Sequence, residues 1–177
     1  MTTLLGLCGS LRGASYNRKL MREAGRLFAP ERFVEGDLRL PLYDGDLEDR
    51  GMPAEVQALA DAIEAADAVV IACPEYNKAL PGVLKNALDW VSRGEGNPWL
   101  HKPVAIVSAT GGRAGGERAQ FSLRLCLVPF RPLVLPGPEV LVGQAKAQFD
   151  EDGRLINERN LKALETLMQD LRAAAER

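Results

Sequence analysis

The chain has 177 residues, a length that accommodates one globular domain with one core. Hydrophobic residues make up 46% and charged residues 26%, which excludes a disordered tail, a collagen-like fibre and a coiled-coil rod. The formal net charge is −2, from 22 Lys and Arg against 24 Asp and Glu, so the basic excess of a dedicated nucleic-acid binder is missing. We therefore predict a single domain over residues 1–177 in which any recognition charge is local.

Cysteine usage and the length of the apolar runs bear on the cellular setting. Cys8, Cys73 and Cys126 are odd in number and form no CxxC pair, so we expect neither a disulfide framework nor a zinc site. The longest apolar run, residues 68–73, is far too short to span a bilayer, and the first residues lack a signal-peptide pattern. We expect a cytoplasmic protein without a membrane partner.

Short apolar stretches that end at turn signals predict buried strands. Three of them are each followed by a helical pattern: Leu4 to Cys8, Ala68 to Cys73 and Val104 to Ser108. Near-continuous apolar strands are buried on both faces, so these indicate a parallel sheet covered by helices. Residues 33–40 alternate and predict an edge strand. A fifth strand is expected near residues 133–135 or at residues 139–142.

Apolar residues at 3.6-residue spacing predict amphipathic helices. The four clearest patterns lie in residues 20–28, 56–63, 83–91 and 161–175. Residues 119–128 carry apolar residues on two faces. One face holds Ala119, Leu123 and Leu127, and the other holds Phe121, Leu125 and Val128. The second face predicts a subunit contact, and the alternative is a helix buried within the monomer.

The alternation of strands and helices predicts a three-layer, doubly wound α/β fold with a five-stranded parallel sheet. Two strand orders fit, the flavodoxin-like order 2-1-3-4-5 and the dinucleotide-binding order, and the chain length favours the first. The charged residues 44–50 are expected to form a solvated loop. Ligands of such sheets bind beyond the carboxyl ends of the strands, which makes the loops after the first, third and fourth strands the candidate site.

The loop after the first strand has the composition of a phosphate cradle. Glycines allow a tight backbone, Ser10 and Ser15 offer hydroxyls, Asn17 an amide and Arg12 a guanidinium, and the following helix adds unpaired N–H groups. Residues 1–32 also carry six Lys or Arg against two Glu, a local net charge of +4. The alternative is an ordinary turn in which Ser15 or Asn17 caps the helix and Arg12 points into solvent.

This first loop matches none of three familiar phosphate motifs. It lacks the Gly-Lys-Ser/Thr ending of a Walker A loop and the spacing of a GxGxxG fingerprint. A low-molecular-weight phosphatase would need Arg six positions after its Cys, whereas Arg12 follows Cys8 by four and position 14 is Ala. Cysteine-based phosphatase chemistry is therefore not expected.

The other two loops suit a flat ligand. Residues 74–82 include two prolines, Pro74 and Pro81, and the irregular backbone between them can present N–H groups to the edge of a flat ligand on which Tyr76 stacks. The alternative is a rigid turn that Pro81 ends at the start of a helix. Residues 108–116 contain four glycines, which permit close approach of a ligand or a mobile loop.

Acid–base machinery is nearly absent from the sequence. His101 is the only histidine and has no partners for a triad or a metal site, and Glu75 has no second carboxylate at a useful spacing. A phosphate cradle with a platform for a flat ring and few catalytic side chains indicates chemistry supplied by a cofactor.

Three motifs carry a family resemblance. The segment Gly9-Ser10-Leu11-Arg12 with Ser15 and Asn17, the segment Pro74-Glu75-Tyr76-Asn77, and residues 81–90 (PGVLKNALDW) closely resemble the NAD(P)H-dependent FMN reductase family of flavodoxin-like proteins. The resemblance is closest to its chromate and quinone reductase branch. Residues 40–44 and 115–120 are similar to that family as well, so the likeness runs over nearly the whole chain.

The resemblance implies an FMN cofactor reduced by NADPH or NADH. It implies that the FMN phosphate is bound by Ser10, Arg12, Ser15, Tyr16 and Asn17. It implies that the ring lies against Pro74, Glu75, Tyr76 and Asn77, with Ser108, Gly111 and Gly112 nearby. No catalytic side chain and no metal are expected.

The resemblance also implies a homodimer or homotetramer and a small-molecule electron acceptor, which could be a quinone, free flavin, an azo compound or a chromate-like oxyanion. The alternatives from other classes are a flavodoxin-like electron carrier and a non-catalytic flavin-binding module. No site for the adenosine 2′-phosphate of NADPH stands out, although Arg113 and Arg118 are candidates.

Overall fold

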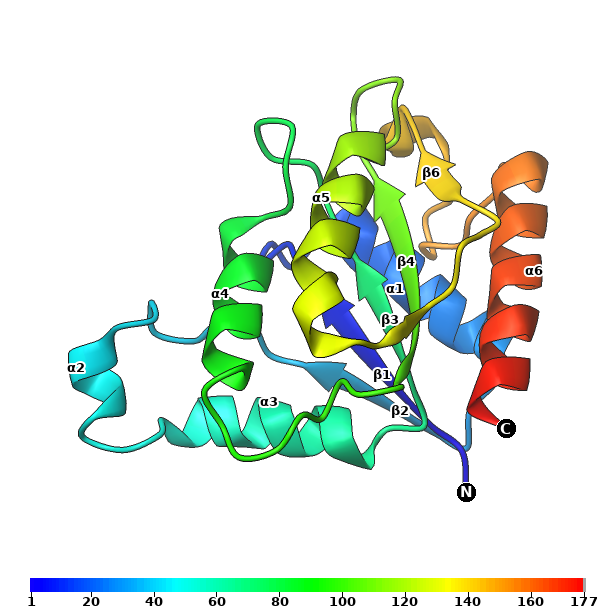
Figure 1. The fold of residues 1–177 in the computed structure, drawn as a ribbon. Helices are drawn as coiled ribbons and strands as arrows, with labels where there is room; N and C mark the ends of the chain where they lie inside the picture. Colours follow the sequence, from blue (N-terminus) through cyan, green and yellow to red (C-terminus); the bar gives the residue numbers. More distant parts are fainter. Residues whose placement is uncertain (177) are drawn as a thin grey trace.

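The computed structural model describes residues 1–176, which form a parallel sheet between two layers of helices (Figure 1). The strands are β1 (Thr3–Cys8), β2 (Arg32–Gly36), β3 (Ala68–Ala72), β4 (Pro103–Ala109), β5 (Leu133–Val134) and β6 (Val140–Val142). The helices are α1 (Tyr16–Phe28), α2 (Gly45–Glu48), α3 (Ala54–Ala65), α4 (Gly82–Val91), α5 (Glu117–Leu127) and α6 (Glu158–Ala175), with short 3-10 turns η1 (Val128–Phe130) and η2 (Ala145–Ala147).

The strand order is β2-β1-β3-β4-β5, with every neighbouring pair parallel, which confirms the predicted flavodoxin-like topology. The fifth position is shared by two short strands. β5 pairs with the start of β4 and β6 pairs with its end, so both candidate stretches form strands. Pro136 and Pro138 lie between them, and proline has no N–H to donate to a strand ladder.

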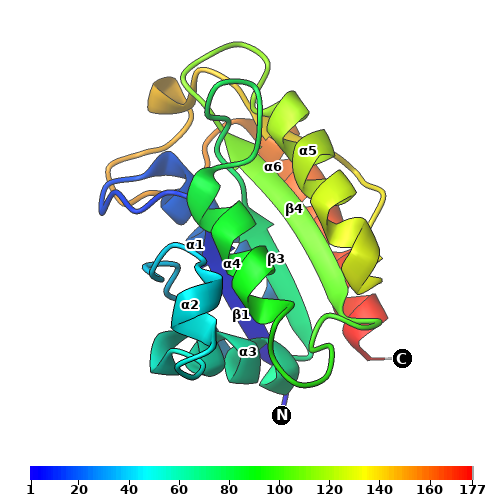
Figure 2. The same cartoon turned by 60° about the vertical axis from the view of Figure 1, so that its left-hand side comes forward.

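Helices cover both faces of this sheet. α1 and α6 lie on one face, and α3, α4 and α5 lie on the other, as the turned view also shows (Figures 1 and 2). Along β3, Val70 packs into the core under α1 and α6 whereas Val69 and Ile71 pack into the core under α3, α4 and α5. All three are at most 1% exposed, which explains why this strand shows no polar alternation.

The edge strand is shorter than predicted. β2 ends at Gly36 rather than continuing to residue 40, because the chain then turns inward and buries Leu38 to 2% exposure. Beyond it, the Pro41 carbonyl accepts hydrogen bonds from Trp90 Nε1 and Asn86 Nδ2, both at 2.8 Å, which anchors the segment to α4. After Gly36, burial of Leu38 and the hydrogen bonds to the Pro41 carbonyl hold the chain in place of pairing with β1.

The charged residues 44–50 contain one helical turn that was predicted as loop. Asp44 caps α2 by accepting a hydrogen bond from the Asp46 N–H at 3.0 Å, and no residue of α2 is buried. The segment is solvated, as predicted, but ordered by this cap. Within residues 1–176, no helix is long and apolar enough to cross a membrane.

Candidate functional site

The loops after β1, β3 and β4 meet at the carboxyl edge of the sheet and enclose a cavity of about 370 Å³. The loops after β3 and β4 extend above the sheet at the top of Figure 1. The cavity is lined by Ser10, Arg12, Ala14, Ser15, Tyr16, Asn17, Pro74, Glu75, Tyr76, Ala109, Thr110 and Gly111. The three loops that the sequence singled out are therefore the ones that build it.

The loop after β1 presents hydrogen-bond donors without acceptors. The N–H groups of Ser10, Leu11, Arg12 and Ala14 donate to no acceptor within residues 1–176. The Arg12 side chain is exposed and has no ion-pair partner in the same range. Unpaired N–H groups beside a free guanidinium form a site for an anion.

Ser15 and Asn17, at the end of this loop, make hydrogen bonds that stabilise the fold. Ser15 caps α1 by accepting a hydrogen bond from the Asn17 N–H at 3.2 Å, as the alternative interpretation of the loop required. The Asn17 amide donates to the Ala109 carbonyl at 2.7 Å and accepts from the Ala109 N–H at 3.0 Å. Asn17 therefore joins the start of α1 to the end of β4, and it is 4% exposed.

The loop after β3 packs closely against the loop after β1 at Gly9. A Cβ at Gly9 would lie 2.7 Å from Leu84 and 3.0 Å from Pro74, so only glycine permits this approach. Tyr76 is half exposed at the cavity. Asn77 does not line it, because the Tyr76 and Ala79 backbones bond to each other and make Asn77 a turn residue with positive φ.

The loop after β4 contributes Ala109, Thr110 and Gly111 to the cavity, and the predicted Ser108 and Gly112 lie outside the lining. Ser108 is fully buried. The Gly112 carbonyl accepts from the Gln144 N–H at 3.0 Å, on the side away from the cavity. The sequence prediction did not include Ala109. Side chains alternate between the two faces of a strand, so Ser108 and Ala109 point to opposite faces of β4, and this pattern could have identified Ala109.

Ser108 belongs to a buried polar network under this loop. Its hydroxyl donates to the Gly115 carbonyl at 2.6 Å and accepts from Gln120 Nε2 at 2.9 Å. Gln120 Nε2 also donates to the Val140 carbonyl at 3.0 Å. The network ties β4, the glycine-rich loop, α5 and β6 together, so it fixes the loop that borders the cavity.

The cavity has little acid–base or nucleophilic chemistry of its own. Burial raises the pKa of Cys8, and burial together with the nearby Glu75 charge raises the pKa of Cys73 to about 12, so both thiols stay protonated at neutral pH. Glu75 is the one carboxylate in the lining, and its Oε1 lies 3.6 Å from Arg118 Nη1. His101 is exposed at the opposite end of β4.

A flavodoxin-like sheet with an anion cradle, an aromatic wall and almost no catalytic side chains defines a binding site for a phosphorylated planar cofactor. Within the described residues, no group of His, Cys, Asp or Glu could hold a metal ion. The class is therefore that of a flavodoxin-like nucleotide-cofactor protein.

Comparison with known proteins identifies the family. Residues 2–147 match the family described as NADPH-dependent FMN reductase, and the chain belongs to this family. It is 43% identical over 172 residues to an NAD(P)H-dependent FMN reductase of Pseudomonas aeruginosa, covering 96% of this chain and 91% of that protein. It is 40% identical over 164 residues to a quinone reductase of Escherichia coli, covering 89% and 87% of the two chains.

A solved structure supports the same assignment. The flavoenzyme NAD(P)H:(acceptor) oxidoreductase FerB of Paracoccus denitrificans superposes with a TM-score of 0.89 at 33% identity, covering 99% of this chain and 98% of that one. The chain is thus an oxidoreductase that uses FMN and NAD(P)H, as the resemblance implied.

Replacing Ser108 tests the buried network. Ser108→Ala leaves the Gly115 carbonyl and one Gln120 N–H without partners, and we expect it to lower the free energy of unfolding by about 2 kcal/mol. Chemical denaturation measures this change. Ser92→Ala, which removes an exposed hydroxyl on α4's C-terminal end, is the matched control. A Ser108→Ala effect no larger than that of the control would show that the network does not support the loop.

Proposed function

We propose that this chain transfers electrons from NAD(P)H, through FMN bound in the cavity at the carboxyl edge of the sheet, to a quinone-type acceptor. The observation that carries the proposal is the loop after β1, where Arg12 and residues with unpaired N–H groups line the cavity. The acceptor class is suggested by the relatives, among them the Escherichia coli protein named quinone reductase. Residues 1–177 act in this proposal as one FMN-binding reductase domain.

The donor set fits the phosphate of FMN. A phosphate needs several donors, and the loop supplies N–H groups, the hydroxyls of Ser10 and Ser15, and the Arg12 guanidinium. The Tyr16 backbone N–H at the start of α1 also lacks an acceptor within the described chain. Asn17 contributes by holding this helix start in place.

The remaining lining residues suit a flat ring. Pro74, Glu75 and Tyr76 form one wall and Thr110 and Gly111 form the other, with open space around Gly111, where a Cβ would meet nothing within 4 Å. When bound, FMN accepts hydride from the nicotinamide and supplies two electrons to the acceptor. The protein's residues orient the reactants and keep them at close distance, and no side chain needs to act as a nucleophile. In this proposal Ser108 supports the loop after β4 through its buried hydrogen bonds, and the predicted Asn77 and Gly112 lie next to lining residues.

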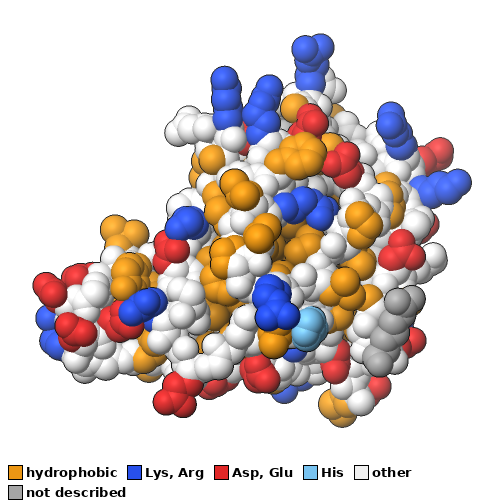
Figure 3. Space-filling model, viewed as in Figure 1, with side chains coloured by type: hydrophobic (Ala, Val, Ile, Leu, Met, Phe, Trp, Pro, Cys, Tyr) orange, Lys and Arg blue, Asp and Glu red, His pale blue; other side chains and the backbone are white. Residues whose placement is uncertain are grey.

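We also propose that the protein is a homodimer or homotetramer in the cytoplasm. Phe121, Leu125 and Val128 are 57%, 73% and 67% exposed on the outer face of α5 and η1. Hydrophobic side chains gather on this side of the molecule in Figure 3. An exposed apolar set of this kind is typical of a subunit contact. The three cysteines are all free, in keeping with a reducing compartment.

Steady-state kinetics test the function. We expect NAD(P)H oxidation with a benzoquinone acceptor and parallel double-reciprocal lines, because donor and acceptor use the same cofactor in turn. Free FMN, an azo dye and chromate in the same assay define the acceptor range. Absence of NAD(P)H oxidation with every acceptor would contradict the proposal. It would favour an electron carrier if FMN is bound, or a ligand-binding module if it is not.

Replacing Arg12 tests the phosphate site. Arg12→Ala removes a charge-assisted hydrogen bond, which contributes about 1.5 to 3 kcal/mol, so FMN affinity should fall by roughly 10- to 100-fold. Fluorescence titration of apoprotein with FMN measures it. The control is Arg32→Ala, an exposed arginine at the start of β2 that belongs to the same basic N-terminal segment. An unchanged Kd for Arg12→Ala, or an equal loss in both variants, would contradict a direct contact.

Replacing Leu125 tests the subunit contact. Leu125→Glu puts a charge in the centre of the exposed apolar face, and burying an unpaired charge is strongly unfavourable. We expect the oligomer to dissociate to monomers in analytical ultracentrifugation, with the helical circular dichroism retained. A variant that keeps the wild-type sedimentation coefficient would place the contact elsewhere.

A further inference from the structure

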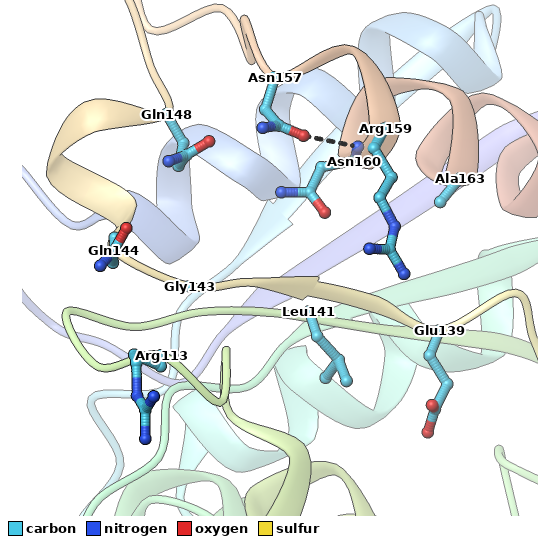
Figure 4. Close-up of a pocket in the computed structure, with 10 residues that line it drawn as sticks. All are labelled: Arg113, Glu139, Leu141, Gly143, Gln144, Gln148, Asn157, Arg159, Asn160 and Ala163. Carbon is cyan, nitrogen blue, oxygen red and sulfur yellow. Dashed lines mark hydrogen bonds between the residues drawn. The ribbon is translucent and has the colours of Figure 1, made fainter.

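A second, larger hollow of about 590 Å³ lies beside the flavin cavity (Figure 4). It is formed by the loop after β4, the end of β6, η2 and the start of α6. No part of the flavin site proposed above uses it.

One loop forms a wall of both hollows. Thr110 and Gly111 line the flavin cavity, and Arg113 lines the second hollow. Backbone hydrogen bonds fix this loop to the β6–η2 segment, from the Ala145 N–H to the Thr110 carbonyl at 2.9 Å and from the Gln144 N–H to the Gly112 carbonyl at 3.0 Å. A ligand that extends from the flavin cavity across this loop therefore reaches the second hollow.

The polar side chains of the second hollow are largely unused. Arg113 and Arg159 are exposed and have no ion-pair or hydrogen-bond partner within residues 1–176, and the same holds for the side-chain amides of Gln148 and Asn160. By contrast, the guanidinium of Arg26 elsewhere in the chain is held by Glu23 at 2.8 Å. The hollow therefore keeps its cations and amide donors available for a ligand.

The arrangement of these groups suits a phosphorylated ligand. In Figure 4 the Arg159 guanidinium and the Gln148 and Asn160 amides lie on one side of β6, whereas Arg113 lies on its other side, on the loop after β4, with its guanidinium directed away from them. Glu139 is the one carboxylate in the lining and forms no salt bridge within the described residues. A guanidinium matches a phosphate in charge and geometry, and amides bond to ribose hydroxyls.

We propose that the second hollow binds the 2′-phosphate end of NADPH, with Arg159 as its main contact. The inference rests on the proposed function, in which the nicotinamide must enter the flavin cavity while the adenosine half extends out of it. The shared loop makes this hollow an adjoining place with a free cation. NADH has an uncharged hydroxyl at the same position, so Arg159 would select NADPH over NADH.

Nucleotide binding tests the inference without turnover. Calorimetry on the FMN-loaded protein should show 2′,5′-ADP binding about tenfold or more tightly than 5′-AMP, because the two differ in the 2′-phosphate. Arg159→Ala should remove this preference. The control is Arg50→Ala, an exposed arginine after α2 that lines neither hollow. Equal binding of the two nucleotides by the wild type, or an unchanged preference in Arg159→Ala, would overturn the assignment.

Kinetics separate this inference from the function on which it rests. Arg159→Ala should raise KM for NADPH about tenfold while kcat and the KM for NADH stay at wild-type values. An equal rise of KM for both donors would overturn the assignment, because it would place the contact on a group that they share. If the assignment fails while NADH oxidation by the wild type persists, the proposed function stands. Absence of NADH and NADPH oxidation by the wild type would overturn both.

Discussion

The side-chain amide of Asn17 holds the functional edge of this molecule together. It donates a hydrogen bond to the Ala109 carbonyl at 2.7 Å and accepts one from the Ala109 N–H at 3.0 Å, as the backbone of a neighbouring strand would do at the end of β4. The contact spans 92 residues of sequence and is buried, which makes it a strong constraint on the distance between the loops after β1 and β4. The shape of the cavity depends on that distance, because both loops contribute residues to its lining.

The groups that hold the loops in place differ from the groups that are left free for a ligand. Packing and hydrogen bonds of Gly9, Asn17, Ser108 and Gln120 hold three loops in place, while the groups left free are backbone N–H donors and the Arg12 guanidinium. In the proposed function such a site holds the phosphate and the ring of FMN, and the reactivity comes from FMN and NAD(P)H. The buried polar network therefore holds the loops in position. Burial raises the pKa of the two thiols near the site, so they stay protonated.

The order of elements and the location of the site could be predicted from the sequence because both depend on patterns along the chain. Apolar stretches such as residues 68–72 and the turn residues after them fix which loops share an edge. The direction of side chains at strand ends could not be predicted. Ser108 was expected at the ligand, but strand alternation turns it toward Gln120. The hydrogen bond from the Asn17 amide to the Ala109 carbonyl was not predicted, because it joins residues 92 apart in the sequence and no local pattern reveals it. The end of β2 was missed for the same reason, since burial of Leu38 is a tertiary effect.

In the proposed function the loop after β1 binds the phosphate of FMN and thereby holds the ring in the cavity. Riboflavin has the same ring without the phosphate, so its affinity relative to FMN isolates this contact. Titration of the apoprotein with both compounds should give riboflavin a Kd at least about a hundredfold higher, because several charge-assisted hydrogen bonds are lost. Affinities within about threefold of each other would contradict the account, since the free donors of this loop would then have no part in binding the cofactor.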